Sequence, residues 1–307
     1  MKTIKHFALA LVAVACGLGF TSCNQNNPDD YSDYPQLIVG KWFNFTPESS
    51  MYMEFKADGT YHIVGYDKQF SLDFVDGVGA YQLDGNKLTT KSYSSSIELT
   101  RTIELTEDRF IDYKEIISDN SGVIIGNSEK VNYRIQEQFD IKGNYSYLNS
   151  VVNIKAAEGK TALQLPEGVT FKGQNSIPVD AMHGDRIIDV MKKFFADATF
   201  AADGKLNHTL DGEAKTKNYT LDGNNLTFNL YEGSETYKVN ATSFPDEDGD
   251  RLFIIIPKQA AWLGGMVDMI EKEQTDLTLT EAQIAELEKE FMATFETFTV
   301  ILSLSKK

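Results

Sequence analysis

The stretch MYMEFKADGTYHIV, residues 51–64, decides the fold class of the chain. Apolar and polar residues alternate on both sides of Asp58-Gly59, as is typical of strands with one buried face. The Asp-Gly pair predicts a tight hairpin turn, because glycine tolerates the positive φ angle that such a turn requires. Similar runs recur between about residues 37 and 136 and predict about eight strands, the spacing expected of a small barrel or sandwich.

The second half of the chain repeats the landmarks of the first half in the same order. The echoed pairs are GKWFN at 40–44 with GNYSY at 143–147, FKADG at 55–59 with FAADG at 200–204, LDGNKLT at 83–89 with LDGNNLT at 221–227, and EDRFI at 107–111 with DGDRLFI at 248–254. The first pair is closer together than the later three, which places an insertion near the start of the second half. Four echoes in one order predict a duplicated fold.

Helical segments interrupt the second half. Apolar residues recur at helical spacing in residues 187–195 and again in residues 262–270. A third helix is predicted to begin after Thr280, because Gln283 stands where a capping box requires it. Residues 298–304 alternate and predict a strand that closes the sheet. The predicted fold is therefore mainly β, with two antiparallel barrels at residues 35–138 and 139–307, the second with helical insertions.

The N-terminus has the layout of a secretory signal. Lys2 and Lys5 precede an apolar run that is too short to span a bilayer, which takes roughly 20 apolar residues. The residues before Cys23 resemble the bacterial lipobox, with Phe20 in place of the usual aliphatic residue. This resemblance implies that residues 1–22 are removed and that lipid on Cys23 anchors the protein to a membrane. The alternative is an ordinary secretory signal, with Cys23 incidental.

The polar residues 23–34 predict a flexible tether between the anchor and the first barrel. Acidic residues close behind Cys23 resemble the surface-export tether of Bacteroidetes lipoproteins. That resemblance implies the outer membrane of the cell envelope, either on its periplasmic side or at the cell surface.

The charge of the chain excludes one class of partner. The chain has 29 basic and 45 acidic residues, for a formal net charge of −16. Nucleic-acid binding depends on basic patches that neutralise phosphates. Nucleic acid is therefore not expected as a partner.

A family resemblance rests on two short motifs. Gly40-Lys41-Trp42 on the first predicted strand, followed by Phe55 and the Asp58-Gly59-Thr60 turn, is similar to the lipocalin and calycin superfamily. More narrowly, both halves resemble the lipocalin-like domains of Bacteroidetes lipoproteins. The resemblance implies tandem barrels that bind small, often apolar molecules. The second half departs from the pattern, because Tyr145 replaces the tryptophan and helices are inserted.

Five aromatic residues are the candidate ligand contacts, because an eight-stranded barrel either fills its interior with side chains or holds one small ligand. They are Trp42, Phe55, Tyr61, Phe194 and Trp262. Core packing is the alternative role for all of them. The helix at 187–195 is either a lid over a cavity or a helix packed on the barrel.

No catalytic residue, metal or cofactor is predicted. His62, His183 and His208 are scattered without the spacing of a metal site. The sequence has no nucleophile elbow, phosphate loop or dinucleotide fingerprint. A pair of carboxylates for glycoside hydrolysis stays open, because such pairs form in space rather than in sequence.

The expected function is non-catalytic binding of a small apolar or amphipathic ligand in the cell envelope. The main alternative is a protein-interaction or inhibitor module with an envelope protein as partner, since calycin-type barrels also serve in that role. A glycan-binding component or glycan hydrolase is the third class.

Overall fold

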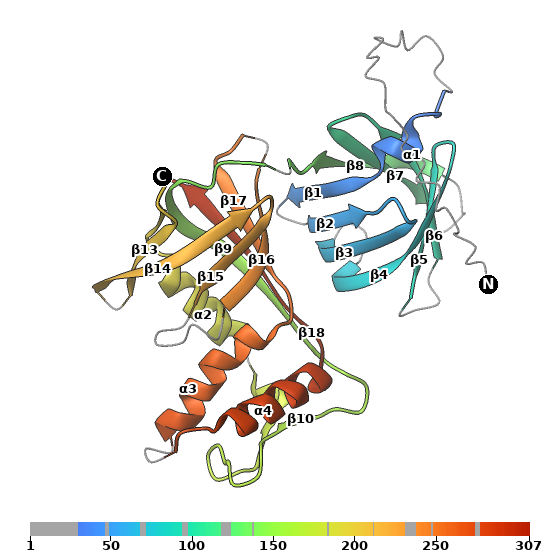
Figure 1. The fold of residues 1–307 in the computed structure, drawn as a ribbon. Coiled ribbons are helices and arrows are strands. Elements are labelled where there is room, and N and C mark those ends of the chain that lie inside the picture. Colours follow the sequence, from blue (N-terminus) through green and yellow to red (C-terminus); the bar gives the residue numbers. More distant parts are fainter. Residues whose placement is uncertain are drawn as a thin grey trace, which may run out of the picture.

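The computed structural model describes residues 30–307 except 47–48, 68–71, 94–97, 118–123, 137, 183, 211, 231–237, 247 and 274–276. The predicted signal peptide, Cys23 and most of the tether lie outside these residues. The described chain forms two closed antiparallel barrels of eight strands each (Figure 1). This architecture confirms the predicted mainly β fold with helical insertions in the second barrel.

Barrel 1 follows a short helix, α1 (Tyr34–Leu37), and its strands are neighbours in chain order. They are β1 (Gly40–Thr46), β2 (Ser49–Phe55), β3 (Thr60–Asp67), β4 (Leu72–Asp84), β5 (Lys87–Ser92), β6 (Glu98–Leu105), β7 (Arg109–Ile117) and β8 (Ile124–Arg134). Antiparallel pairing of β1 with β8 closes the barrel. The predicted hairpin is β2–β3, where Phe55 pairs with Tyr61 and Gly59 has a φ of +82°.

Barrel 2 has the same strand order with two excursions. Its strands are β9 (Gly143–Ala156), β12 (Ala198–Phe200), β13 (Lys205–Leu210), β14 (Glu213–Asp222), β15 (Asn225–Asn229), β16 (Lys238–Pro245), β17 (Arg251–Ile256) and β18 (Phe295–Lys306). Pairing of β18 with β9 closes it. Thus β9 takes the place of β1, β12 that of β2, and β18 that of β8. The echoed landmarks fall on equivalent strands and turns, with Gly85 and Gly223 at equivalent turns and φ angles of +54° and +58°.

The excursions are the predicted helical insertions. The first, between β9 and β12, contains β10 (Ala162–Gln164), β11 (Ser176–Pro178), the 3-10 helix η1 (Val179–Ala181) and α2 (Gly184–Phe194). The second, between β17 and β18, contains η2 (Ala260–Trp262), α3 (Leu263–Glu273) and α4 (Glu281–Thr294). The helices α3 and α4 gather with β10 at one end of barrel 2 (Figure 1). Strand β18 begins in this region at Phe295, but its pairing with β17 starts only at Val300.

Trp42 plugs one end of barrel 1. Its indole is fully buried, and Nε1 donates a hydrogen bond to the backbone oxygen of Ile38, 2.8 Å away. The Arg134 guanidinium lies 4.2 Å from the centroid of the indole and donates to the backbone oxygens of Val39 and Glu107. Phe110 meets the indole edge-on. The first strand, the last strand and the chain after α1 are therefore tied together at this end.

Side chains fill the described interior of barrel 2. Phe200, Leu206, Phe228, Leu252, Ile254 and Leu302 all belong to one buried cluster. Helix α2 adds Met191 and Phe194 to the same cluster, and Phe195 directly after the helix also belongs to it. The Phe194 ring lies 4.1 Å from the His208 ring. This packing agrees with the alternative that the 187–195 helix packs on the barrel.

The two barrels share a third apolar cluster. The outer faces of β1, β2 and β3 contribute Phe43, Tyr52 and Val64. The outer faces of β16, β17 and β18 cover them with Phe244, Phe253, Ile255 and Ile301. The Phe43 ring centroid lies 4.7 Å from that of Phe244 and 4.5 Å from that of Phe253. Burial of so much apolar surface holds the barrels against each other.

A polar contact borders this inter-barrel cluster. Thr299 Oγ1 of barrel 2 donates to Asp76 Oδ2 of barrel 1 at 2.7 Å, and His62 Nε2 lies 2.9 Å from Asp76 Oδ1. Burial raises the pKa of Asp76, but the hydrogen bonds from His62 and Thr299 and the nearby charge of Lys258 lower it, and the net result is a pKa below the ordinary value. Asp76 is therefore held as a carboxylate between the barrels.

Candidate functional site

A cavity of about 360 Å³ lies against the helical insertions of barrel 2. Its described lining comes from the segment before α2, from α2 itself, from η2 and α3, and from the start of β18. Phe298 is the one described lining residue that belongs to a barrel strand. The cavity is therefore built by the insertions and does not lie inside a barrel.

Apolar side chains make up most of the wall. They are Phe171, Ile177, Ala181, Met182, Ile187, Val190, Met191, Trp262, Met266 and Phe298. On α2, Ile187, Val190 and Met191 share a face because helical residues three and four apart are neighbours. Met191 is buried at the back, whereas Val190 is 44% exposed. The wall thus runs from a buried floor to an open rim.

Trp262 is fixed in the wall of the cavity. Its Nε1 donates to the backbone oxygen of Pro257 at 3.0 Å, and its ring centroid lies 5.4 Å from that of Phe298. Met266, one turn further along, is also buried and lines the same cavity. A tryptophan held through its N–H and a methionine offer a large apolar surface in a defined place.

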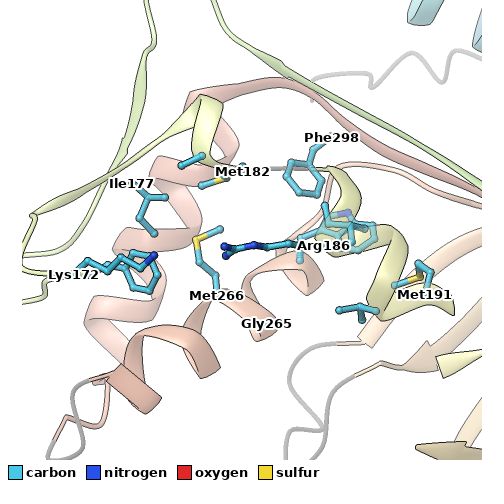
Figure 2. Close-up of a pocket in the computed structure, with 13 residues that line it drawn as sticks. Lys172, Ile177, Met182, Arg186, Met191, Gly265, Met266 and Phe298 are labelled. Atoms are coloured by element: carbon cyan, nitrogen blue, oxygen red, sulfur yellow. The ribbon is translucent and has the colours of Figure 1, made fainter. Parts of the chain in front are cut away.

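Two cations line the cavity among these apolar groups. Figure 2 shows Arg186 extending from α2 toward Met266, with Lys172 on the opposite side of the cavity. Lys172 stands at the tip of a tight turn closed by a bridge between Phe171 and Gln174, and its φ of 51° is unusual for a residue other than glycine. No acidic residue belongs to the described lining.

The five predicted ligand contacts do not meet in one site. Trp42, Phe55 and Tyr61 all lie in the core of barrel 1, where the Phe55 and Tyr61 ring centroids are 6.2 Å apart. Phe194 lies in the core of barrel 2. Trp262 alone of the five lines the cavity.

Sequence reasoning missed Arg186 and Lys172. A signal for Arg186 exists, because Met182, Arg186 and Val190 are spaced four apart and form a stripe beside the core-facing positions of α2. Nothing comparable marks Lys172, which reaches the cavity only through the fold of the segment before α2.

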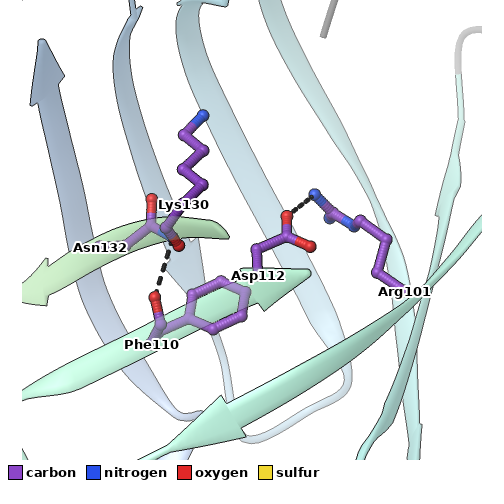
Figure 3. Close-up of polar contacts among 5 residues, drawn as sticks. All are labelled: Arg101, Phe110, Asp112, Lys130 and Asn132. Carbon is purple, nitrogen blue, oxygen red and sulfur yellow. Dashed lines mark hydrogen bonds and ion pairs between the residues drawn. The ribbon is translucent and has the colours of Figure 1, made fainter. Parts of the chain in front are cut away.

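The interior of barrel 1 is polar over part of β6, β7 and β8 (Figure 3). Arg101 Nη1 lies 2.6 Å from Asp112 Oδ2, and the buried Asn132 donates from Nδ2 to the backbone oxygen of Phe110 at 3.0 Å. Lys130 is buried opposite Asp112 in the strand register. Burying charges is costly unless they are paired, so this part of the interior is a poor match for a purely apolar ligand.

The described part of the chain shows neither a metal-binding cluster nor a membrane-spanning helix. Its His, Cys, Asp and Glu side chains form no group of three that could hold a metal ion. None of its helices combines the length and apolar character needed to cross a bilayer.

Two comparisons with known proteins found no match for the chain. No protein-family model matches the chain. A search of curated proteins gives no match either. The resemblance to lipocalin-like lipoproteins therefore rests on the short motifs of the sequence, together with two closed eight-stranded barrels that are consistent with a calycin-like fold.

Proposed function

We propose that this protein binds a small amphipathic molecule, without catalysis, in the cavity against the insertions of barrel 2. The observation that carries this proposal is the cavity itself, with its mostly apolar wall and two cationic side chains. Sites for small ligands are typically concave and apolar, about 300–1,000 Å³ in volume, with a few polar groups that orient the ligand. The cavity of about 360 Å³ falls in this class.

The proposal places the protein in the cell envelope as a Bacteroidetes-type lipoprotein with tandem lipocalin-like barrels. Support comes from the lipobox-like residues before Cys23, the Gly-x-Trp and Asp-Gly-Thr motifs, and the paired barrels. Lipid on Cys23 would hold the protein at the outer membrane. A Cys23→Ala variant should move from the membrane fraction to the soluble fraction, and unchanged fractionation would refute the anchor.

Tryptophan fluorescence tests the cavity directly. The chain has two tryptophans, and Trp42 is fully buried in barrel 1, so a ligand in the cavity should change the emission of Trp262. Titration of the soluble chain, residues 24–307, with 1-decanol should give a saturable shift to shorter wavelength. A Trp262→Phe variant should lose that signal.

A cavity-filling pair locates the binding. Gly265→Leu places a side chain from α3 into the cavity and should abolish the response to 1-decanol. Ala285→Leu adds the same side chain at an exposed position of α4 that does not line the cavity, and should leave the response unchanged. Absence of a saturable response, or its survival in Gly265→Leu, would overturn the proposal.

A further inference from the structure

We infer that the ligand of the cavity is a single-chain anionic amphiphile whose head group binds between Arg186 and Lys172. The inference rests on the proposed function, because it names the ligand class of the same cavity. Three observations carry it: the size of the cavity, the position of Arg186, and the position of Lys172.

The size of the cavity limits the apolar part of the ligand. A heavy atom in a liquid occupies about 30 Å³ when water is taken as the scale, so 360 Å³ accommodates about a dozen heavy atoms. The apolar walls come from several separate segments, and one of the lining residues, Met191, is fully buried. One flexible chain of about ten carbons fits these limits better than a fused ring system of twice the size.

Arg186 marks where the head group lies. Its neighbours on α2 include two exposed acids, Asp185 and Asp189, and the second is at the i+3 spacing at which helix ion pairs form. Within the residues that the structure describes, no hydrogen bond or ion pair joins Arg186 to either acid. The side chain instead extends into the cavity (Figure 2). A guanidinium in that place offers paired N–H donors to a carboxylate or a similar oxyanion.

Lys172 supplies a second positive charge from the opposite wall. Its backbone adopts a left-handed conformation that is unfavourable for a residue other than glycine. This turn holds the side chain at the cavity, with Nζ 5.4 Å from the Phe171 ring centroid. The described lining holds two cations and no acidic side chain, so it favours an anionic ligand.

Because the whole chain is acidic, a preference for an anionic ligand cannot come from its net charge. A formal net charge of −16 repels anions and attracts cations at long range. Preferential binding of an anionic amphiphile would therefore have to come from groups at the site. This reasoning predicts the order decanoate, then 1-decanol, then decyltrimethylammonium, for three probes with the same ten-carbon length and different heads.

Calorimetric titration of residues 24–307 with these three probes tests the inference. The double variant Lys172→Gln/Arg186→Gln should bind decanoate about 10- to 100-fold more weakly, the loss expected for hydrogen bonds to a charged group. Its affinity for 1-decanol should change less than about two-fold, since that head makes no charge-assisted bond. Lys192→Gln/Lys193→Gln removes two charges from the same helix outside the described cavity lining, and should leave the decanoate affinity unchanged.

The outcomes separate this inference from the proposed function. Equal affinity for decanoate and 1-decanol would overturn the anionic head and leave the apolar site standing. A decanoate preference that survives in Lys172→Gln/Arg186→Gln would overturn the placement of the head. Failure of all three probes to bind the unaltered chain would overturn the proposed function as well.

Discussion

Gly65 in β3 illustrates how closely the strands of barrel 1 approach one another. A Cβ atom at this position would lie 1.9 Å from the backbone oxygen of Ser50 and 2.8 Å from Cα of Met51. Its φ of +142° is also one that residues with a side chain rarely adopt. We expect Gly65→Ala to lower the free energy of unfolding by about 3 kcal/mol, through backbone strain and overpacking. Urea denaturation followed by circular dichroism measures the change.

Gly77, on the adjacent strand β4, is the matched control. A Cβ atom there meets nothing within 4 Å. Gly77→Ala should therefore change the free energy of unfolding by less than about 1 kcal/mol. The change is an increase if the main effect of alanine is to restrict the unfolded chain. Equal effects of the two substitutions would contradict the close approach of β3 to β2.

At the scale of single residues, the sequence predicts the burial of some side chains but not the position of others. Trp42, Phe55 and Tyr61 are large aromatic residues in alternating strands, so their burial could be anticipated, although the choice between ligand contact and core could not. The position of Lys172 at the cavity could not be anticipated. It depends on a turn conformation and on packing between segments distant in sequence, neither of which a local pattern encodes.

At the scale of elements, prediction succeeded where local chemistry determines the structure. Helix α4 begins after Thr280, whose hydroxyl accepts from the Gln283 backbone while the Gln283 side chain accepts from Thr280. That capping box needs only neighbouring residues, so the sequence revealed it. The short β10–β11 pair was not predicted, because strands of three residues carry too little periodicity.

The ion pair between β6 and β7 gives an element-scale prediction. Asp112 is 4% exposed through its side chain and pairs with Arg101, while Lys130 is buried opposite it on β8. Asp112→Asn removes the negative charge that the Arg101 guanidinium meets inside the barrel. We expect a loss of about 3–5 kcal/mol in the free energy of unfolding, the usual effect of removing one partner of a buried pair. Chemical denaturation at neutral pH measures it.

An exposed ion pair on β5 and β6 provides the comparison. Lys91 Nζ lies 3.9 Å from Glu98 Oε2, and both side chains are more than half exposed. Glu98→Gln should cost less than about 1 kcal/mol, because water screens surface pairs. If Asp112→Asn were equally mild, the polar interior of barrel 1 would have to be hydrated rather than closed.

At the scale of the whole molecule, we expect the contact between the two barrels to contribute to the free energy of unfolding of the protein. Phe43 points away from the core of barrel 1 yet is only 6% exposed, because Phe244 and Phe253 cover it. Phe43→Ala should lower the free energy of unfolding by about 3–5 kcal/mol, as for a phenylalanine in a core. Tyr93→Ala, at a position 64% exposed, should change it by no more than about 0.5 kcal/mol. A neutral Phe43→Ala would show that the barrels are independent.

The contact between the barrels was not predicted, although the sequence carries a trace of it. The runs WFNF at 42–45 and LFIII at 252–256 are apolar at nearly every position, which is typical of strands buried on both faces. Strand alternation identified one buried face for each strand. It could not say what covers the other face, because that depends on how two closed barrels are docked.

The same contact joins different faces of the two barrels. Barrel 1 uses the outer faces of β1–β3 and barrel 2 uses those of β16–β18, which are non-equivalent faces of equivalent folds. A head-to-tail association of this kind leaves a free copy of each face and, if repeated, grows into a filament. At the free face of barrel 2, the echo places Ser146, Asp197 and Thr209 where barrel 1 has Phe43, Tyr52 and Val64. Asp197 and Thr209 are exposed and polar, so the described part of this face lacks the apolar surface with which barrel 2 could repeat the contact.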